Sequence, residues 1–253
     1  MSLNLPSVIG HRGAAAHAPE NTLAGFRVAK TLGCTWVEFD VRLTADGWPV
    51  VCHDDKLERT TGVRGRVSAL PLADILRLDA GSWFAARFAG ERIPTLDDVL
   101  TLCRELGLGA NVELKAERDR GPATAAAVID RLARLGGDAP SRILVSSFLP
   151  DAIAATAALA ASLPRGMLWR KLPRSWRRIA ARLGCATIHC RHTELTQDIA
   201  AEVCAEGYPL LVYTVNAPLR AQQLFAWGVA SVFSDAPDII GPAAVEPRRG
   251  VSL

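Results

Sequence analysis

Two periods of apolar residues alternate along the second half of this chain. Short apolar runs recur between segments whose apolar positions follow helical spacing. Buried strands and amphipathic helices give these two patterns, and their regular alternation predicts parallel strands joined by helical crossovers. The predicted strands are 110–115, 142–148, 165–169, 186–190, 209–215 and 230–234, and the predicted helices are 121–135, 151–163, 174–183, 196–206 and 218–227.

The first half follows the same rhythm with one interruption. A short strand at 7–10 leads to a helix with Asn21 or Thr22 as its N-cap, and a second strand follows. Residues 54 to about 92 break the pattern with Gly, Pro and aromatic residues, and so resemble an excursion from a larger scaffold. A capping box at Thr95 then opens a helix that runs to about Leu106.

The count of strands decides between two α/β architectures. The pattern holds about eight parallel strands, the number that closes a (β/α)8 TIM-type barrel. An open, doubly wound sheet is the alternative, although the first strand–helix turn, Gly10-His11-Arg12-Gly13, is no dinucleotide fingerprint. We therefore expect a single barrel domain over residues 1–253, with an insertion at about 44–94.

Composition limits the classes of function. With 49% hydrophobic and 22% charged residues, the 253-residue chain can bury a sizeable core. A net charge of +3 is too small to indicate nucleic-acid or membrane binding, so we expect a small-molecule substrate and no stable membrane association. The six cysteines are scattered, without a Cys-x-x-Cys pair, and are interpreted as reduced core thiols. Together with the lack of a secretory signal pattern at the N-terminus, this favours a cytoplasmic location.

The stretch from Trp36 to Asp54 carries the candidate chemistry. Glu38 and Asp40 are two residues apart on a predicted strand and therefore share a face. Adjacent carboxylates repel each other, so a hard divalent cation between them is the simplest explanation. Asp46-Gly47 is a hairpin turn signal, and folding back symmetrically about it would place His53 opposite Asp40. Taken alone, the stretch is equally consistent with an amphipathic hairpin that has a solvated polar face.

In a closed barrel, further polar residues meet at the C-terminal ends of the strands. Glu113 joins Glu38 and Asp40 in an oxygen-rich set that suits Mg²⁺, Ca²⁺ or Mn²⁺ better than zinc. His11 and His53 could transfer protons near neutral pH, while Arg12 and Lys115 could hold phosphate oxygens. A cation, cationic side chains and two proton-transfer groups together suit phosphodiester cleavage.

An ordered series of motifs over nearly the whole chain resembles the glycerophosphodiester phosphodiesterase family. The series consists of His11-Arg12-Gly13, Pro19-Glu20-Asn21-Thr22, Glu38-x-Asp40-Val41, Thr44-x-Asp46-Gly47, Val51-x-His53-Asp54, Thr61-Gly62, Pro94-Thr95-Leu96 and Glu113-x-Lys115, with looser matches at Tyr213-Thr214-Val215-Asn216 and Ser234-Asp235-x-Pro237.

This resemblance implies a barrel with a small inserted subdomain after the second barrel strand. It also implies metal-dependent hydrolysis of glycerophosphodiesters to glycerol 3-phosphate and an alcohol. By the same resemblance, Glu38, Asp40 and Glu113 bind one divalent cation, Mg²⁺ or Ca²⁺ with Mn²⁺ as a third candidate, and His11 and His53 are catalytic. Tyr213 stands where the family more often has Trp, which leaves the shape of the alcohol pocket open.

Several roles stay open at the level of sequence. We favour His53 as general base and His11 as general acid, with either water or the substrate's glycerol hydroxyl as nucleophile. Arg12 could also pair with Glu20, and Lys115 could serve only to neutralise Glu113. Two other functions are a lysophospholipase D-type reaction and a non-catalytic barrel that binds phosphodiesters. The aromatic residues Trp83, Phe84 and Phe88 are interpreted as a small core of the insertion, or alternatively as a wall of the alcohol pocket.

Overall fold

The computed structural model describes residues 3–117, 119–136 and 142–240. Its parallel strands are β1 (Val8–Gly10), β2 (Trp36–Leu43), β4 (Gly109–Leu114), β5 (Ile143–Ser147), β6 (Arg165–Trp169), β7 (Thr187–Arg191), β8 (Leu210–Tyr213) and β9 (Ser231–Ser234). The helices between them are α1 (Leu23–Thr31), α4 (Leu96–Leu106), α5 (Gly121–Leu135), α6 (Pro150–Leu159), α7 (Trp176–Leu183), α8 (Gln197–Ala205) and α9 (Pro218–Ala226).

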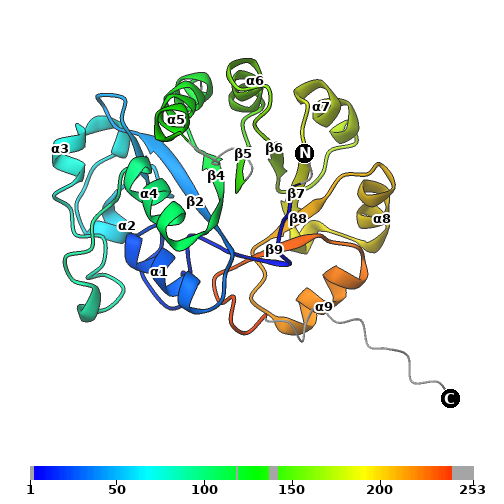
Figure 1. Cartoon of the computed structure of the whole chain (residues 1–253), viewed down its shortest axis with the longest axis horizontal. Coiled ribbons are helices and arrows are strands. Elements are labelled where there is room, and N and C mark those ends of the chain that lie inside the picture. Colours follow the sequence, from blue (N-terminus) through cyan, green and yellow to red (C-terminus); the bar gives the residue numbers. More distant parts are fainter. Residues whose placement is uncertain (1–2, 118, 137–141, 241–253) are drawn as a thin grey trace.

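The sheet closes on itself. β1 pairs in parallel with β9 on one side and with β2 on the other, and each remaining strand pairs with its neighbour in chain order. The helices surround these eight strands (Figure 1). The predicted (β/α)8 barrel is therefore confirmed, and the open-sheet alternative is wrong.

Strand residues are buried on both faces, because side chains fill the barrel interior and helices cover its outside. The interior contains a layer of large apolar side chains, while two other clusters lie between the strands and the helices. The interior layer consists of Ile9, Trp36, Leu144, Leu211 and Phe233.

Helix ends follow their local chemistry. Of the two predicted N-caps for α1, Thr22 takes the role, since its Oγ1 accepts a hydrogen bond from Gly25 N at 3.1 Å. The capping box of Thr95 and Asp98 at α4 is present as predicted. Helix α6 ends at Leu159, earlier than the predicted residue 163, and Pro164 follows soon after it.

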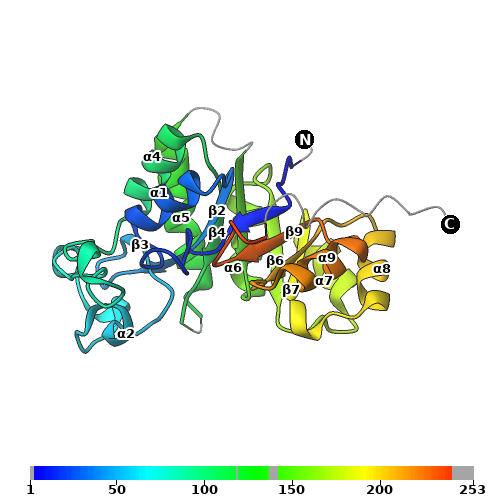
Figure 2. The ribbon, with the colours of Figure 1, turned by 90° about the horizontal axis from the view of Figure 1, so that it is seen from below.

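The segment between β2 and α4 departs from the barrel pattern. It holds β3 (Pro49–Val51), which pairs antiparallel with β2, and the short helices α2 (Glu58–Thr61), η1 (Val67–Ala69), α3 (Leu72–Ile75) and η2 (Ala86–Phe88). We call this segment, residues 44–94, the insert. Figures 1 and 2 show it at one end of the molecule, with α8 at the opposite end.

The insert has its own aliphatic core, built from Val50, Cys52, Leu57, Val67, Ile75, Ala80 and Ile93. The aromatic residues Trp83, Phe84 and Phe88 are not part of that core. They pack edge to face on one another, and Trp83 is 40% exposed. The favoured interpretation of these three residues as the core of the insert is therefore wrong.

Two further expectations concern cysteines and membranes. All six cysteines are unpaired thiols, and five of them are buried, as predicted. Across the described ranges, no helix combines the length and the apolar character needed to cross a membrane.

Candidate active site

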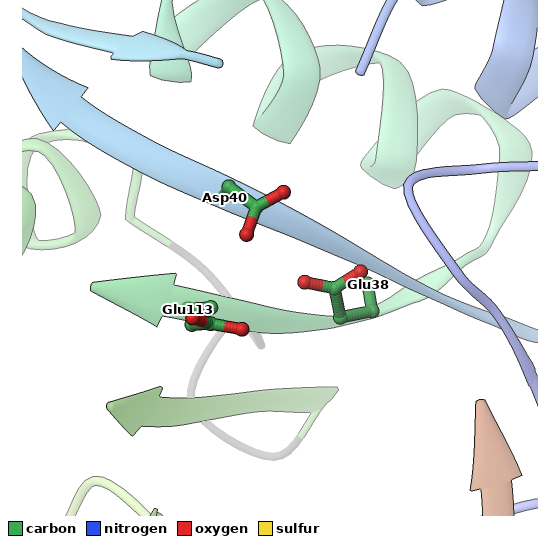
Figure 3. Close-up of side chains that lie close together, drawn as sticks. All are labelled: Glu38, Asp40 and Glu113. Atoms are coloured by element: carbon green, nitrogen blue, oxygen red, sulfur yellow. The ribbon is translucent and has the colours of Figure 1, made fainter. Parts of the chain in front are cut away.

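Three carboxylates gather on two neighbouring strands. Asp40 of β2 lies in register with Glu113 of β4, and Glu38 points to the same inner face because it is two residues away. One oxygen of each side chain lies within 4.8 Å of the others, and all three residues are buried. Figure 3 shows the three side chains grouped along β2 and β4. The predicted two-residue spacing therefore does bring these carboxylates together, and we call them the acidic cluster.

Two cations neutralise only part of the acidic cluster. Lys115 Nζ lies 2.9 Å from Glu113 Oε1 and 3.3 Å from Asp40 Oδ1, and Arg12 Nε lies 3.5 Å from Asp40 Oδ2. Burial raises the pKa of Asp40, but Lys115 and Arg12 outweigh burial and hold that pKa well below its usual range. For Glu38, burial and then repulsion from Asp40 raise the pKa to about 8.

The acidic cluster fits a divalent cation. Within the part of the chain that the structure describes, Glu38 Oε1 is buried and has no hydrogen-bond partner, although a buried carboxylate normally requires a partner or a nearby positive charge. Carboxylate oxygens are the donors that Mg²⁺ and Ca²⁺ prefer. A cation held by Glu38, Asp40 and Glu113 would supply the missing charge.

His11 follows β1 and faces the acidic cluster. Its Nδ1 lies 2.6 Å from Asp235 Oδ1, and its Nε2 lies 3.8 Å from Glu38 Oε2. Asn216 Nδ2 donates to the other oxygen of Asp235 at 2.7 Å, which fixes the orientation of that carboxylate. Burial lowers the pKa of His11, but the hydrogen bond to Asp235 and the charge of Glu38 outweigh burial and raise the pKa above its usual value.

His53 lies just beyond β3, at the start of the insert's irregular part. Its Nδ1 lies 2.6 Å from Asp54 Oδ1. Burial lowers the pKa of His53, and the charges of Lys115 and Arg12 also lower it, so the attraction of Asp40 does not restore its usual value. In both histidines Nδ1 therefore has a carboxylate partner, which leaves Nε2 to exchange a proton with a bound molecule.

The predicted register of this hairpin is wrong by one residue. Val41 pairs with Val51, so Cys52 is opposite Asp40, and Cys52 N donates to Asp40 O at 2.9 Å. The turn after Leu43 is asymmetric because Thr44 Oγ1 accepts from Trp48 N at 2.9 Å. His53 still influences Asp40 electrostatically, since its charge lowers the pKa of that carboxyl.

Arg12 adopts a left-handed backbone conformation, with φ of 49°. In this conformation its N–H donates to Glu38 Oε2 at 3.0 Å, and its guanidinium Nη1 donates to Glu20 Oε1 at 2.8 Å. The predicted pairs Arg12–Glu20 and Lys115–Glu113 are thus both present. Each cation also approaches Asp40, Lys115 Nζ at 3.3 Å and Arg12 Nε at 3.5 Å.

Three members of this network were not predicted as functional residues. In the sequence, Asp235 and Asn216 belong to the looser family matches and receive no role of their own, and Asp54 stands beside His53 in a motif. A carboxylate directly after a predicted histidine was a usable signal for Asp54.

His189, by contrast, lies inside the barrel. Burial lowers its pKa to about 3, and its Nε2 is hydrogen-bonded to Thr187 Oγ1 at 2.8 Å.

Comparison with known proteins assigns these features to one family. The model of the glycerophosphoryl diester phosphodiesterase family matches residues 11–239. A glycerophosphodiester phosphodiesterase of Caldanaerobacter subterraneus subsp. tengcongensis is 32% identical over 92% of this chain and 95% of its own.

Two solved structures are similar over the whole barrel. A phosphodiesterase of Oleispira antarctica, solved in complex with the product sn-glycerol-3-phosphate, is 38% identical with a TM-score of 0.91, over 95% of this chain and 97% of its own. A glycerophosphodiester phosphodiesterase of Agrobacterium tumefaciens is 29% identical with a TM-score of 0.78, over 93% of this chain and 99% of its own.

Proposed function

The chain belongs to the glycerophosphoryl diester phosphodiesterase family, and we propose that it hydrolyses glycerophosphodiesters to glycerol 3-phosphate and an alcohol. The observation that carries this proposal is the buried acidic cluster together with two histidines that act on it, His11 at 3.8 Å from Glu38 and His53 through its charge on Asp40. Each histidine has a carboxylate partner. The product bound to the Oleispira antarctica phosphodiesterase supports glycerol 3-phosphate as the product here.

Glu38, Asp40 and Glu113 are proposed to hold one divalent cation, Mg²⁺ or Ca²⁺ with Mn²⁺ as a third candidate. When bound, this cation supplies Lewis-acid polarisation of the phosphate ester. Arg12 and Lys115 bind phosphate oxygens. Both cations flank Asp40, and their side chains are only 18% and 15% exposed. Their positive charges also offset the charge that develops on the phosphoryl oxygens.

The two histidines divide the proton transfers. The lowered pKa of His53 favours its neutral form, so it takes the proton of the attacking oxygen as general base. The raised pKa of His11 favours its charged form, so it gives a proton to the leaving alkoxide as general acid. Asp54 and Asp235 hold the respective rings with Nε2 free for these transfers.

Purified protein stripped with EDTA provides the test. We expect it to release glycerol 3-phosphate from glycerophosphocholine only after Mg²⁺, Ca²⁺ or Mn²⁺ is added, and His53→Ala and Glu38→Ala to abolish that release. Asp238→Asn, a change outside the site, should retain activity. If folded protein releases nothing with any of the three metals, hydrolysis of this substrate is refuted, and lysophospholipids become the next substrates to assay.

The nucleophile and the location require separate tests. Trapping a cyclic glycerophosphate would identify attack by the substrate's own hydroxyl, whereas exclusive ¹⁸O incorporation from solvent without a cyclic species would identify water. We propose a cytoplasmic location, which the six unpaired cysteines support. Recovery of the native protein only from an oxidising compartment after cell fractionation would contradict this.

A further inference from the structure

We propose that Arg59 is a positioning residue that orients two active-site residues, His53 and Arg12, at once. It acts on the general base His53 through Asp54, and on the phosphate-binding residue Arg12 through Glu20. The inference rests on the proposed function, and it adds a residue of the insert to the machinery of the barrel.

All three nitrogens of the Arg59 guanidinium donate hydrogen bonds to these carboxylates. Nε donates to Asp54 Oδ2 at 2.6 Å, Nη1 to Glu20 Oε2 at 2.7 Å and Nη2 to Glu20 Oε1 at 2.8 Å. The planar fork of arginine matches this bidentate geometry, which a lysine ammonium cannot reproduce. The guanidinium carbon also lies 5.9 Å from the centroid of the Trp83 ring.

On the first side, Asp54 is held at both of its oxygens. Oδ2 accepts from Arg59 while Oδ1 is bonded to Nδ1 of His53. Burial raises the pKa of Asp54, but the hydrogen bonds from Arg59 and His53 outweigh burial and hold the pKa at about 2. Asp54 therefore stays an ionised acceptor with a fixed plane, and the ring of His53 is fixed with it.

On the second side, two arginines share one carboxylate. Glu20 Oε1 accepts from Arg12 Nη1 and from Arg59 Nη2, each at 2.8 Å. The Glu20 side chain is only 10% exposed, whereas that of Arg59 is 43% exposed. Arg59 thus fixes the position of Glu20 from the solvent side, and Glu20 in turn keeps the Arg12 guanidinium next to Asp40.

A purely structural explanation is that Arg59 only attaches the insert to the barrel. Arg66, which also lies in the insert, provides a matched control that tests this explanation. Arg66 Nη1 lies 2.7 Å from Asp55 Oδ2 and 3.6 Å from Glu117 Oε1, so it likewise joins the insert to the loop after β4. Neither of these partners is bonded to His53 or Arg12 in the described residues.

The kinetic test compares Arg59→Ala, Arg59→Lys and Arg66→Ala in the metal-loaded, full-length enzyme. We expect Arg59→Ala to lower kcat and raise KM, with a combined loss in kcat/KM of about 10- to 100-fold. Arg59→Lys should recover little, Arg66→Ala should stay within about twofold of the parent, and added guanidinium ion should partly restore Arg59→Ala. Because Asp54 and Arg59 act as one unit, Asp54→Asn should add little to the loss caused by Arg59→Ala.

A second readout does not depend on activity. In ¹H–¹⁵N correlation spectra of the histidine side chains, with His53 assigned through His53→Gln, the parent and Arg66→Ala should show one His53 tautomer protonated at Nδ1. Arg59→Ala and Arg59→Lys should show exchange between tautomers.

The outcomes separate the proposed reaction from the positioning role of Arg59. An inactive parent whose His53 signals respond to Arg59 as described would refute the proposed reaction but support the positioning role. Unchanged His53 signals in both Arg59 variants, or equal kinetic losses in Arg59→Ala and Arg66→Ala, would overturn the positioning role. If Arg59→Ala does not fold, Arg59→Lys supplies both readouts.

Discussion

Asp235→Asn should move the alkaline limb of the pH–activity profile to lower pH. Asp235 Oδ1 accepts a hydrogen bond from His11 Nδ1 at 2.6 Å, and this hydrogen bond and the charge of Glu38 raise the pKa of His11 despite burial. If His11 is the general acid, as proposed, it must be protonated, so activity should fall as pH rises through its pKa. Removing the charge of Asp235 lowers that pKa, and the fall in activity therefore begins at lower pH.

The hydrogen bond limits the size of the shift. A hydrogen bond to a charged group contributes about 1.5–3 kcal/mol, and one pKa unit corresponds to about 1.4 kcal/mol. The bond therefore accounts for a shift of about 1–2 pH units. Because the Asp235 side chain is 27% exposed and solvent screens its charge, we expect the lower end, about one unit.

The assay is kcat/KM for glycerophosphocholine hydrolysis from pH 5 to 10 at saturating metal. The matched control is Asp238→Asn, because Asp238 Oδ1 pairs with His17 Nε2 at 2.8 Å on the same turn but outside the site. The control should leave both limbs in place. The acid limb, which we assign to His53, should also stay in place in Asp235→Asn, since Asp54 and not Asp235 holds that ring.

Two results would refute this reasoning. An alkaline limb that stays in place in Asp235→Asn would show that His11 does not set it. A limb that moves to higher pH would show that Asp235 does not raise the pKa of His11.

Three further predictions concern stability. Mg²⁺ or Ca²⁺ at about 100 times its Kd should stabilise the EDTA-stripped protein by about 2.7 kcal/mol, which corresponds to a rise in Tm of about 5–10 °C. An equal rise in Tm for Glu38→Gln would contradict the assignment of the cation to the acidic cluster. Leu57→Ala in the insert core should cost about 2–5 kcal/mol in urea unfolding, because Leu57 is fully buried, whereas Leu76→Ala at a 37% exposed site should cost under about 0.5 kcal/mol. Gly109→Ala would place a Cβ 2.3 Å from the Trp36 ring and should cost about 1–3 kcal/mol by thermal unfolding; a neutral result would show that the ring can move aside.

The barrel could be predicted from sequence because its signals are local and repeated. Each strand is a short apolar run, each crossover helix has its own period, and the number of units determines closure. The acidic cluster was predictable for a related reason. Glu38 and Asp40 share a face by strand geometry alone, and β4 supplies Glu113 in register with Asp40.

The hairpin shows where local signals fail. Asp46-Gly47 marks a turn but does not fix how many residues each strand contributes. A difference of one residue in register places Cys52 opposite Asp40, where His53 was predicted. The register is decided by bonds within the loop, such as that between Trp48 N and Thr44 Oγ1 at 2.9 Å. The prediction for the aromatic residues of the insert was wrong for another reason. Hydrophobicity alone does not distinguish residues of a core from a cluster at the surface.

The two histidines show how sequence distance limits such predictions. Asp54 is adjacent to its partner His53, so one motif contains both, whereas Asp235 meets His11 only because β9 closes the barrel against β1. Closure therefore does more than bury strands: it brings the last strand's carboxylate to the first strand's histidine. His53 is oriented by the insert and His11 by the barrel seam between β9 and β1. A change that loosens the insert should therefore affect His53 first, and one that weakens the β1–β9 pairing should affect His11 first.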